Sequence, residues 1–483
     1  MLKSFALRIF VVALVLRLIP VLLARGLGIG LDDMFQYDML ARSLASGNGF
    51  RWYAQDDLNQ LAAFVDFDLS SVKEYDPALG IPTSFRAPLY PTFLAIVYFF
   101  NGIDPSRFFA ARLTQAIFLG APIAPLTYWV AQRLFPILSF KDSEKASRIA
   151  ASIVACYPML LVYPLGLGTE NPFFILLLAS FLFLLLSIEK PTVAHLLLSG
   201  FFLALTTLTR SVILPFTFAA FCLLLFLHRK KAILAILSFL LVVSPWIIRN
   251  SILHQKLTGI ETSMGYNLYL GYHPQGNGSF VFGPSLDLLT ILDDAERDRI
   301  GTEKAMEFLQ AQPGRFIPLA VNRLGFFFGL EKRVLMYFYG NNIIGYIPLP
   351  LLLTISTILL LPFVVIAVSA AFGLAYLRWK PEHILLGLLF LAYILPHVFI
   401  LSEDRFHLAL VPYISILAAQ VWVHGFAPLR ARWAESQTGK WIVSLAILAA
   451  VLLVANWGFE LVRDADKITQ LLGPNGNQSY FPY

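Results

Sequence analysis

Long apolar runs separated by short polar stretches recur along most of the chain. A helix needs about 20 such residues to cross the hydrocarbon core of a bilayer. The pattern therefore predicts an all-α integral membrane protein with about 11 transmembrane helices. The expected crossings lie at 5–23, 108–135, 149–167, 171–188, 194–209, 212–227, 232–249, 350–377, 383–401, 407–424 and 441–461.

One further apolar run, PLYPTFLAIVYFFNG, differs from these crossings. Its apolar part is only about 13 residues long, too short to span, and two prolines open it. We interpret it as an interfacial helix. With this run left out, every basic loop falls on the same side as the amino terminus, as the positive-inside rule requires. The basic residues are Arg133, Lys141, Lys145, Arg148, Lys190, Arg229, Lys230, Lys231, Arg378, Lys380, Arg430, Arg432 and Lys440.

The side on which the basic loops fall also predicts how the chain is organised in an inner membrane. The amino terminus is expected to lie in the cytoplasm. The first segment, which lacks a small-residue cleavage site, is expected to be an uncleaved anchor. An N-terminal transmembrane module covers 1–249 and includes an external loop at 24–107 with interfacial helices. An external loop of about 90 residues with amphipathic helices follows at 250–342. C-terminal transmembrane helices occupy 343–462, and a short external tail, without an evident role, occupies 463–483.

Composition supports a membrane protein, with 58% hydrophobic and 14% charged residues in 483. A soluble chain of this length would need more charge to cover its surface. The two cysteines, Cys156 and Cys222, fall in apolar runs and suggest neither a disulfide framework nor a thiolate metal site. No basic stretch with interleaved aromatics points to nucleic acid.

The predicted topology gathers charged residues of both signs on the face opposite the basic loops. Ionisable groups at a membrane rim are candidates for function, although a rim charge can also simply end a helix or anchor it in headgroups. Because acids and arginines share one face, we favour a functional site there. The residues are Asp32, Asp33, Arg86, Glu170, Arg210, Arg249 and the run Glu403 to His407.

The order and spacing of several motifs resemble the GT-C superfamily of polytopic glycosyltransferases. The motifs are the Asp-Asp pair with Tyr37 four residues later, ARSLASGNGF, FRAPLYP, TENPFF, LTRS, SPWIIRN, GYNLYLGYHPQGNG and DRFHLALVPY. The likeness is greatest to the bacterial branch related to protein mannosyltransferases and the lipid A aminoarabinose transferase. Two departures are Ala87, where relatives commonly have a second proline, and an Asp-Asp pair where many have Asp-Glu.

The resemblance implies transfer of one sugar from a polyprenyl phosphate donor to an acceptor hydroxyl of a lipid, glycan or protein in the cell envelope. The reaction would take place with inversion on the external face. A carboxylate can take the proton of the attacking hydroxyl. Asp33 is the expected base because of its position relative to Tyr37, with Asp32 in reserve. One of the pair is expected to cap the following helix.

The resemblance also implies cationic groups that bind the donor phosphate, and arginine suits this because its planar fork binds phosphate oxygens in pairs. Arg86 is the leading candidate. The other candidates are Arg210, Arg249, Arg405 and His407, each of which can alternatively serve only to end its helix, to pair locally or to bind lipid phosphate. Tyr37, Tyr90 and Asn267 are expected to position substrates.

Glu170, in GLGTENPFF, is expected to shape the site, although it can also be a charge at a helix start with Thr169 as cap. A divalent cation at Asp32, Asp33 and Glu170 is compatible with their oxygen ligands but is not required by them. No cofactor is otherwise predicted. No Gly-rich phosphate loop follows a strand, in agreement with a donor other than a nucleotide sugar.

The competing interpretation is a transporter or flippase of a lipid-linked sugar, which would also need many helices, rim arginines and an apolar groove. Transporters often show internal repeats and charges near the bilayer midplane, and the sequence shows neither clearly. A purely structural scaffold is disfavoured by the one-sided gathering of acids and arginines.

Overall fold

The computed structural model describes residues 4–67, 69, 72, 75–135 and 140–480, and almost all of its regular structure is helical. The N-terminal part contains α1 (Phe5–Leu23), α2 (Asp33–Ala45), β1 (Arg51–Trp52), α3 (Gln55–Leu61), β2 (Ile81–Pro82), α4 (Leu89–Asn101), α5 (Ser106–Thr114), a π-helical turn η2 (Gln115–Gly120), α6 (Ile123–Leu134), α7 (Phe140–Cys156), α8 (Pro158–Val162), η3 (Tyr163–Leu165), α9 (Glu170–Glu189), α10 (Val193–Thr207), η4 (Ser211–Ile213), α11 (Leu214–His228), η5 (Arg229–Ala232) and α12 (Ile233–His254). The two strands pair antiparallel.

The remainder begins with α13 (Met264–Tyr272), α14 (Phe282–Asp287), α15 (Asp294–Ala311), η6 (Pro313–Arg315), α16 (Phe316–Phe327) and η7 (Leu335–Tyr339), in the region where amphipathic helices were predicted. It continues with α17 (Leu349–Gly373), η8 (Leu374–Tyr376), α18 (Pro381–Phe399), η9 (Phe406–Leu410), α19 (Val411–His424), α20 (Ala427–Glu435), α21 (Gln437–Arg463) and α22 (Ala465–Leu471).

Local sequence signals explain many of the helix ends. Ser4, Thr192 and Ser436 each accept a backbone N–H with the side-chain oxygen and so cap α1, α10 and α21. Gly102, at a φ of 90°, ends α4 in a conformation that L side chains rarely adopt. The apolar run at 88–102 thus forms a helix of 13 residues, shorter than a membrane span.

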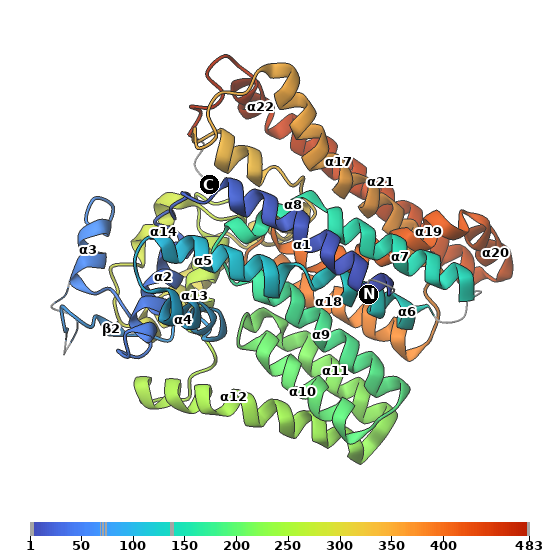
Figure 1. Cartoon of the computed structure of the whole chain (residues 1–483), viewed down its shortest axis with the longest axis horizontal. Helices are drawn as coiled ribbons and strands as arrows, with labels where there is room; N and C mark the ends of the chain where they lie inside the picture. Colours follow the sequence, from blue (N-terminus) through green and yellow to red (C-terminus); the bar gives the residue numbers. More distant parts are fainter. Residues whose placement is uncertain (1–3, 68, 70–71, 73–74, 136–139, 481–483) are drawn as a thin grey trace.

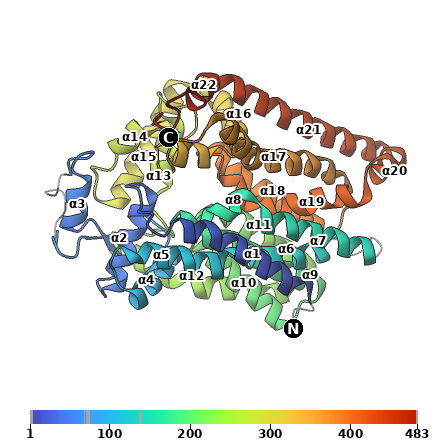
Figure 2. The same ribbon diagram turned by 45° about the horizontal axis from the view of Figure 1, so that its top comes forward.

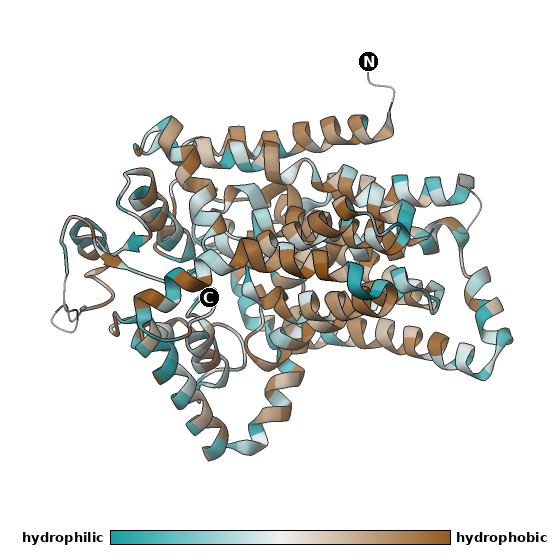
Figure 3. Ribbon diagram, turned by 90° about the horizontal axis from the view of Figure 1, so that it is seen from below, coloured by the Kyte–Doolittle hydropathy of each residue, from teal (hydrophilic) through white to brown (hydrophobic). Residues whose placement is uncertain are grey.

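The long helices form a bundle whose two ends differ (Figure 1). The amino terminus, the turn between α9 and α10 and helix α20 lie at the right end of the view. Helices α2, α3 and α13 to α15 lie at the left end, and the turned view of Figure 2 keeps this separation. Hydrophobic residues dominate the bundle, whereas hydrophilic residues are more frequent in the segments at the ends (Figure 3). This pattern is typical of a membrane protein.

Helices α9 and α19 lie at the centre of the bundle, whereas α1 and α21 lie at its margin. In the most apolar window of the span Phe406–His424, 89% of the residues are buried, compared with 22% for Phe5–Leu23 and for Gln437–Arg463. Because a margin helix that is apolar all round has no water-compatible face, its outer side requires lipid. The prediction of an all-α membrane protein is confirmed.

The predicted number of eleven crossings is not confirmed. Among the described residues, eight helices are long and apolar enough to cross a membrane, or nine if the bent pair α7 and α8 counts as one span. Three places account for the difference. Helix α10 has only 15 residues, α7 and α8 meet at a bend of 51°, and Ser211–His254 counts as one continuous stretch although it contains two predicted crossings joined at Arg229.

Candidate active site

A large cavity of about 2080 Å³ lies where the segments around α2, the start of α9, α13 and residues 403–406 meet. It exceeds the roughly 300–1,000 Å³ typical of small-molecule pockets, so it has room for more than one small ligand. Eight residues predicted for the site line it: Asp32, Asp33, Tyr37, Arg86, Glu170, Arg210, Asn267 and Arg405.

The two predicted carboxylates stand at the start of α2. Asp32 is the N-cap, and its Oδ1 accepts the backbone N–H of Met34 at 2.9 Å. Asp33 is the first residue of the helix, and its side chain remains 41% exposed. One acid of the pair therefore caps the helix, as predicted, and the other presents its carboxylate to the cavity.

Asp33 is held by two arginines from distant parts of the chain. Arg86 donates from Nη2 to one oxygen of Asp33 and from Nε to Gln36 at 2.8 Å. A nitrogen of Arg405 lies 3.6 Å from the other oxygen of Asp33. Arg86 also lies over the ring of Tyr37, with its guanidinium carbon 5.3 Å from the ring centroid. Two of the four arginines predicted to contact the donor thus lie beside the predicted base.

Glu170 occupies a similar position on the other side of Arg405. Its Oε1 lies 2.9 Å from Nη1 of Arg210 and 3.7 Å from Nη1 of Arg405. Glu170 is the first residue of α9, where a carboxylate interacts favourably with the helix dipole. The acids and arginines therefore alternate around the cavity, so that each charge faces at least one opposite charge.

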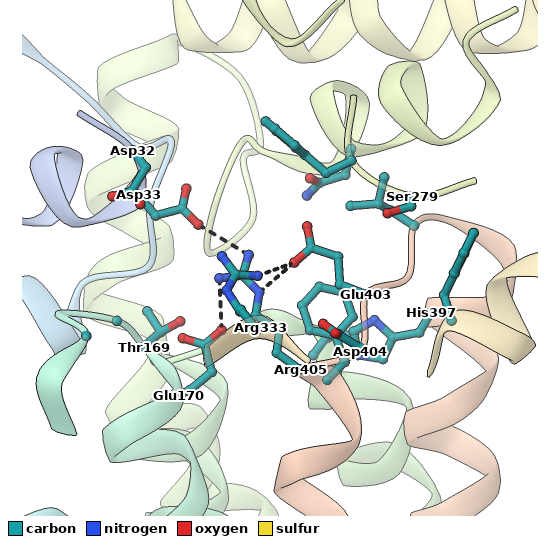
Figure 4. Close-up of a pocket in the computed structure, with 18 of the residues that line it drawn as sticks. Asp32, Asp33, Thr169, Glu170, Ser279, Arg333, His397, Glu403, Asp404 and Arg405 are labelled. Atoms are coloured by element: carbon teal, nitrogen blue, oxygen red, sulfur yellow. Dashed lines mark hydrogen bonds and ion pairs between the residues drawn. The ribbon is translucent and has the colours of Figure 1, made fainter. Parts of the chain in front are cut away.

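Arg333 is a further member of this arrangement that was not predicted as a site residue, and Glu403 was predicted only as part of the charged run from Glu403 to His407. Glu403 contacts Arg333 at 3.0 Å and Nε of Arg405 at 2.8 Å through the same oxygen, Oε2. Figure 4 shows Asp33, Glu170 and Glu403 directed from different sides toward the guanidinium groups. The signal in the sequence was the charged triplet Glu-Lys-Arg at 331–333, which interrupts an apolar stretch.

The charges shift the ionisation of the carboxylates in opposite directions. Burial favours the neutral acid, but Arg86, Arg405 and Arg333 outweigh it and lower the pKa of Asp33 to about 2. Burial and the neighbouring Asp33 raise the pKa of Asp32 above its ordinary value. Burial would lower the pKa of Arg86, yet Asp33 raises it overall. Asp33 is therefore a carboxylate at neutral pH.

Apolar side chains from the long helices continue the cavity beyond its charged part. They come from α11, α17, α18 and α21, and include Leu214, Leu360, Leu391, Leu395 and Leu461. Charged and apolar linings in one cavity suit an amphipathic ligand with a polar head and a hydrocarbon tail.

Three residues predicted for the site are not brought to the cavity lining. Arg249 donates to the backbone oxygen of Thr83 at 2.6 Å and lies over the ring of Trp246. His407 is fully buried and bonded to Glu331 and to a backbone oxygen. Tyr90 is buried and donates to Gln115 at 2.6 Å. In each case tertiary packing supplies a structural partner that the sequence did not reveal.

The carboxylates considered for a metal ion have other partners. Arg86 and Arg405 face Asp33, and Arg210 and Arg405 face Glu170. Among the described residues, no group of three or more His, Cys, Asp or Glu side chains is arranged to hold a metal ion. Guanidinium groups occupy the positions next to the oxygens, so this arrangement does not suit a divalent cation, and we derive no step through one.

Two solved structures share a distant likeness with the chain. The oligosaccharyltransferase of Archaeoglobus fulgidus, tethered to an acceptor peptide, matches 100% of this chain with a TM-score of 0.48 and 16% identity. This chain spans only 59% of that protein's length. ArnT from Cupriavidus metallidurans, bound to undecaprenyl phosphate, matches 90% of this chain and 80% of its own, with a TM-score of 0.39 and 13% identity. No match was found among curated proteins.

The family model described as dolichyl-phosphate-mannose-protein mannosyltransferase matches residues 86–248, about a third of the chain. The matched segment begins at Arg86 and contains Glu170 and Arg210, whereas Asp33 and Arg405 lie outside it. Over this segment, the match confirms the resemblance to membrane glycosyltransferases of the GT-C type that the sequence motifs predicted.

Proposed function

We propose that this protein is a membrane glycosyltransferase that moves a single sugar from a polyprenyl phosphate donor to an acceptor hydroxyl. The observation that carries the proposal is the position of Asp33 beside Arg86 and Arg405 in a cavity that continues between apolar helices. The apolar lining suits an isoprenoid tail, and the arginines suit the single phosphate. We place the cavity on the external face of the inner membrane, opposite the basic loops.

The reaction is a single displacement at the anomeric carbon. The acceptor oxygen forms a bond to that carbon while its proton passes to the carboxylate of Asp33. The bond between the sugar and the phosphate oxygen breaks on the opposite side, and its electron pair leaves with the polyprenyl phosphate. The anomeric configuration is therefore inverted. Arg86 and Arg405 are placed to stabilise the negative charge that develops on the phosphate.

The low pKa of Asp33 suggests that the donor binds before the acceptor reacts. A carboxylate with a pKa of about 2 is a weak base, because the arginines stabilise its charge. A phosphate bound by Arg86 and Arg405 would offset their charge, so the pKa of Asp33 would rise. Donor binding would thus prepare the base before the acceptor reacts.

The direct test is sugar transfer by the purified protein, with a radiolabelled polyprenyl phosphate sugar as donor. We expect Asp33→Asn to lower kcat at least about 100-fold, because it removes the proton acceptor. Asp56→Asn is a matched control, since Asp56 is an exposed aspartate in the same loop region that does not line the cavity. The anomeric configuration of the product reports inversion.

The purified protein and the labelled donor also distinguish a glycosyltransferase from a flippase. In sealed vesicles, a flippase would move the intact labelled lipid between leaflets without cleaving it. Movement of intact lipid without transfer to any acceptor would contradict the proposal, as would full activity of Asp33→Asn.

A further inference from the structure

A buried polar cluster lies behind the cavity, around Glu331. Its Oε1 lies 3.0 Å from Nε2 of His407 and accepts the hydroxyl hydrogen of Tyr157 at 2.6 Å. All three side chains are 1% exposed or less. Because burial of polar groups is costly without such partners, the cluster holds its members in one arrangement.

The ring of His407 is fixed on its other side as well. Nδ1 donates to the backbone oxygen of Phe327 at 2.7 Å, and the ring stacks on Phe363 with centroids 4.0 Å apart. His407 therefore has both nitrogens and one face engaged. Its role differs from the donor contact that the sequence suggested.

A second contact joins the same two segments at the surface of the cavity. Arg333, two residues after Glu331, contacts Glu403 at 3.0 Å, and Glu403 also contacts Arg405 at 2.8 Å. Two segments, 331–333 and 403–407, are therefore paired at two places, and they run in opposite directions: the first residue of one segment pairs with the last residue of the other. The buried link is Glu331 with His407, and the cavity link is Arg333 with Glu403.

We propose that Glu331 and His407 are positioning residues that set the placement of Arg333 in the cavity, and thereby the affinity for a polyprenyl phosphate. This inference rests on the proposed function. Only one residue, Lys332, separates Glu331 from Arg333 in the chain, so a shift of Glu331 is passed directly to Arg333. A displacement of about 1 Å is large for a group that binds phosphate through fixed hydrogen bonds.

The test measures coupling between the two links. We propose to determine the affinity of undecaprenyl phosphate, without a sugar, for the purified protein in lipid nanodiscs. Glu331→Leu and Arg333→Ala are each expected to weaken binding about tenfold. If the buried link acts through Arg333, the double variant binds no worse than Arg333→Ala alone. A purely structural role predicts instead that the two losses multiply, and that result would overturn the inference.

Two further variants sharpen the comparison. Glu331→Gln keeps the size of the side chain and an amide oxygen that can take the place of Oε1, accepting from Tyr157 and facing Nε2 of His407, so it is expected to bind within about twofold of the unchanged protein. Glu144→Leu removes a less buried cluster outside the cavity lining, in which Tyr128 and Gln132 donate to Glu144 in the first part of α7. It is expected to lower Tm without changing the affinity.

The outcomes separate the two proposals. Failure of the unchanged protein to bind undecaprenyl phosphate would contradict the proposed function. Binding by the unchanged protein with multiplied losses in the double variant would contradict only the positioning role. If Glu331→Leu does not fold, Tyr157→Phe takes its place, because it removes one hydrogen bond and leaves the carboxylate with His407. Its smaller loss, about threefold, must also disappear in the Arg333→Ala background.

Discussion

Arg405 contacts three carboxylates from three segments of the chain. Its nitrogens lie 2.8 Å from Glu403, 3.6 Å from Asp33 and 3.7 Å from Glu170. The two longer contacts leave room for rearrangement when a ligand enters. A guanidinium stays charged in any such environment, because its pKa is far above neutral pH. The carboxylates of Glu403, Asp33 and Glu170 therefore balance the charge of Arg405, and a bound phosphate would compete with them for its guanidinium.

Arg86 offers a test of this competition at the residue scale. We expect Arg86→Ala to weaken binding of a polyprenyl phosphate about 10- to 100-fold, as for loss of a hydrogen bond to a charged group. Arg249→Ala is the matched control. Arg249 contacts the backbone of Thr83 and the ring of Trp246 outside the cavity lining, so its loss should leave affinity nearly unchanged. Equal affinities for the two variants would remove Arg86 from the donor site.

The ionisation of Asp33 predicts how stability depends on pH. The arginines lower its pKa from 3.8 to about 2, so the folded state binds the proton less readily than the unfolded state. The resulting stabilisation is fully present above pH 4 and is lost as the pH falls through about 2.

We therefore expect Asp33→Asn to have a lower Tm than the unchanged protein at pH 5, and the difference to shrink by pH 2.5. Thermal unfolding in detergent at the two pH values measures it. A difference that stays constant across this range would show that Asp33 does not gain its low pKa from folding.

Buried arginines also organise the protein at the scale of its elements. Arg112, in α5, donates from Nε to the backbone oxygen of Leu165 at 2.8 Å and from Nη2 to that of Gly28 at 2.6 Å. Leu165 precedes Glu170, and Gly28 precedes Asp33. One side chain thus joins the segments that carry the two acids. Arg17 has a related role, since it donates to the oxygens of Val154 and Ala155 at the end of α7.

Replacement of Arg112 tests this connection. Arg112→Leu would leave backbone oxygens without donors inside the protein, at a cost of about 1–3 kcal/mol for each. We expect a clearly lower Tm. We also expect a lower kcat for the protein that remains folded, because the segments that carry Asp33 and Glu170 are no longer held together by hydrogen bonds to Arg112. A lower Tm with unchanged kcat per folded molecule would show that Arg112 stabilises the fold without positioning the acids.

The C-terminal segment belongs to the cavity wall, in contrast to the expectation of a tail without an evident role. Helix α22 contributes Ile468 and Leu471 to the lining. Beyond it, Asn477 donates to Asn342 at 2.7 Å and the backbone N–H of Tyr480 donates to the oxygen of Gly340 at 3.1 Å. These contacts hold the tail against residues 340–342, directly after η7 and its cavity residues.

At the scale of the whole molecule, the proposed function requires the cavity and the basic loops to lie on opposite sides of the membrane. The predicted basic loops lie at the end of the bundle that carries the amino terminus, and the cavity segments lie toward the opposite end (Figure 1). Thr290 and Lys230 are exposed residues toward the two ends. In a protein whose two native cysteines are replaced, each can be changed to cysteine in turn.

We expect a membrane-impermeant maleimide to label Thr290→Cys in spheroplasts and to label Lys230→Cys only after the membrane is opened. The reason is the excess of lysine and arginine around Lys230, which favours retention of that loop in the cytoplasm. Labelling of Lys230→Cys in closed spheroplasts would reverse the topology and place the cavity on the cytoplasmic side.

The pattern of apolar runs was enough to predict the class of fold and the positions of most helices. An apolar run of about 20 residues indicates a helix surrounded by lipid, because the hydrocarbon core of a bilayer excludes charged side chains over that length. The number of membrane crossings was not predicted correctly, because it depends on how the helices pack as well as on composition. The three places concerned are the turn at Arg229, the bend between α7 and α8, and the short helix α10.

The sequence also identified Asp33, Arg86, Glu170 and Arg405 as candidates, because acids and arginines were predicted to share one face and their motifs resemble a known superfamily. Which of the candidates meet depends on tertiary packing. Arg405 lies 372 positions after Asp33 in the numbering, 405 minus 33, yet the two are in contact. No local pattern encodes such a contact, because it arises from the packing of helices that are distant in the chain. The same packing gave His407 and Arg249 structural partners and brought Arg333 into the site.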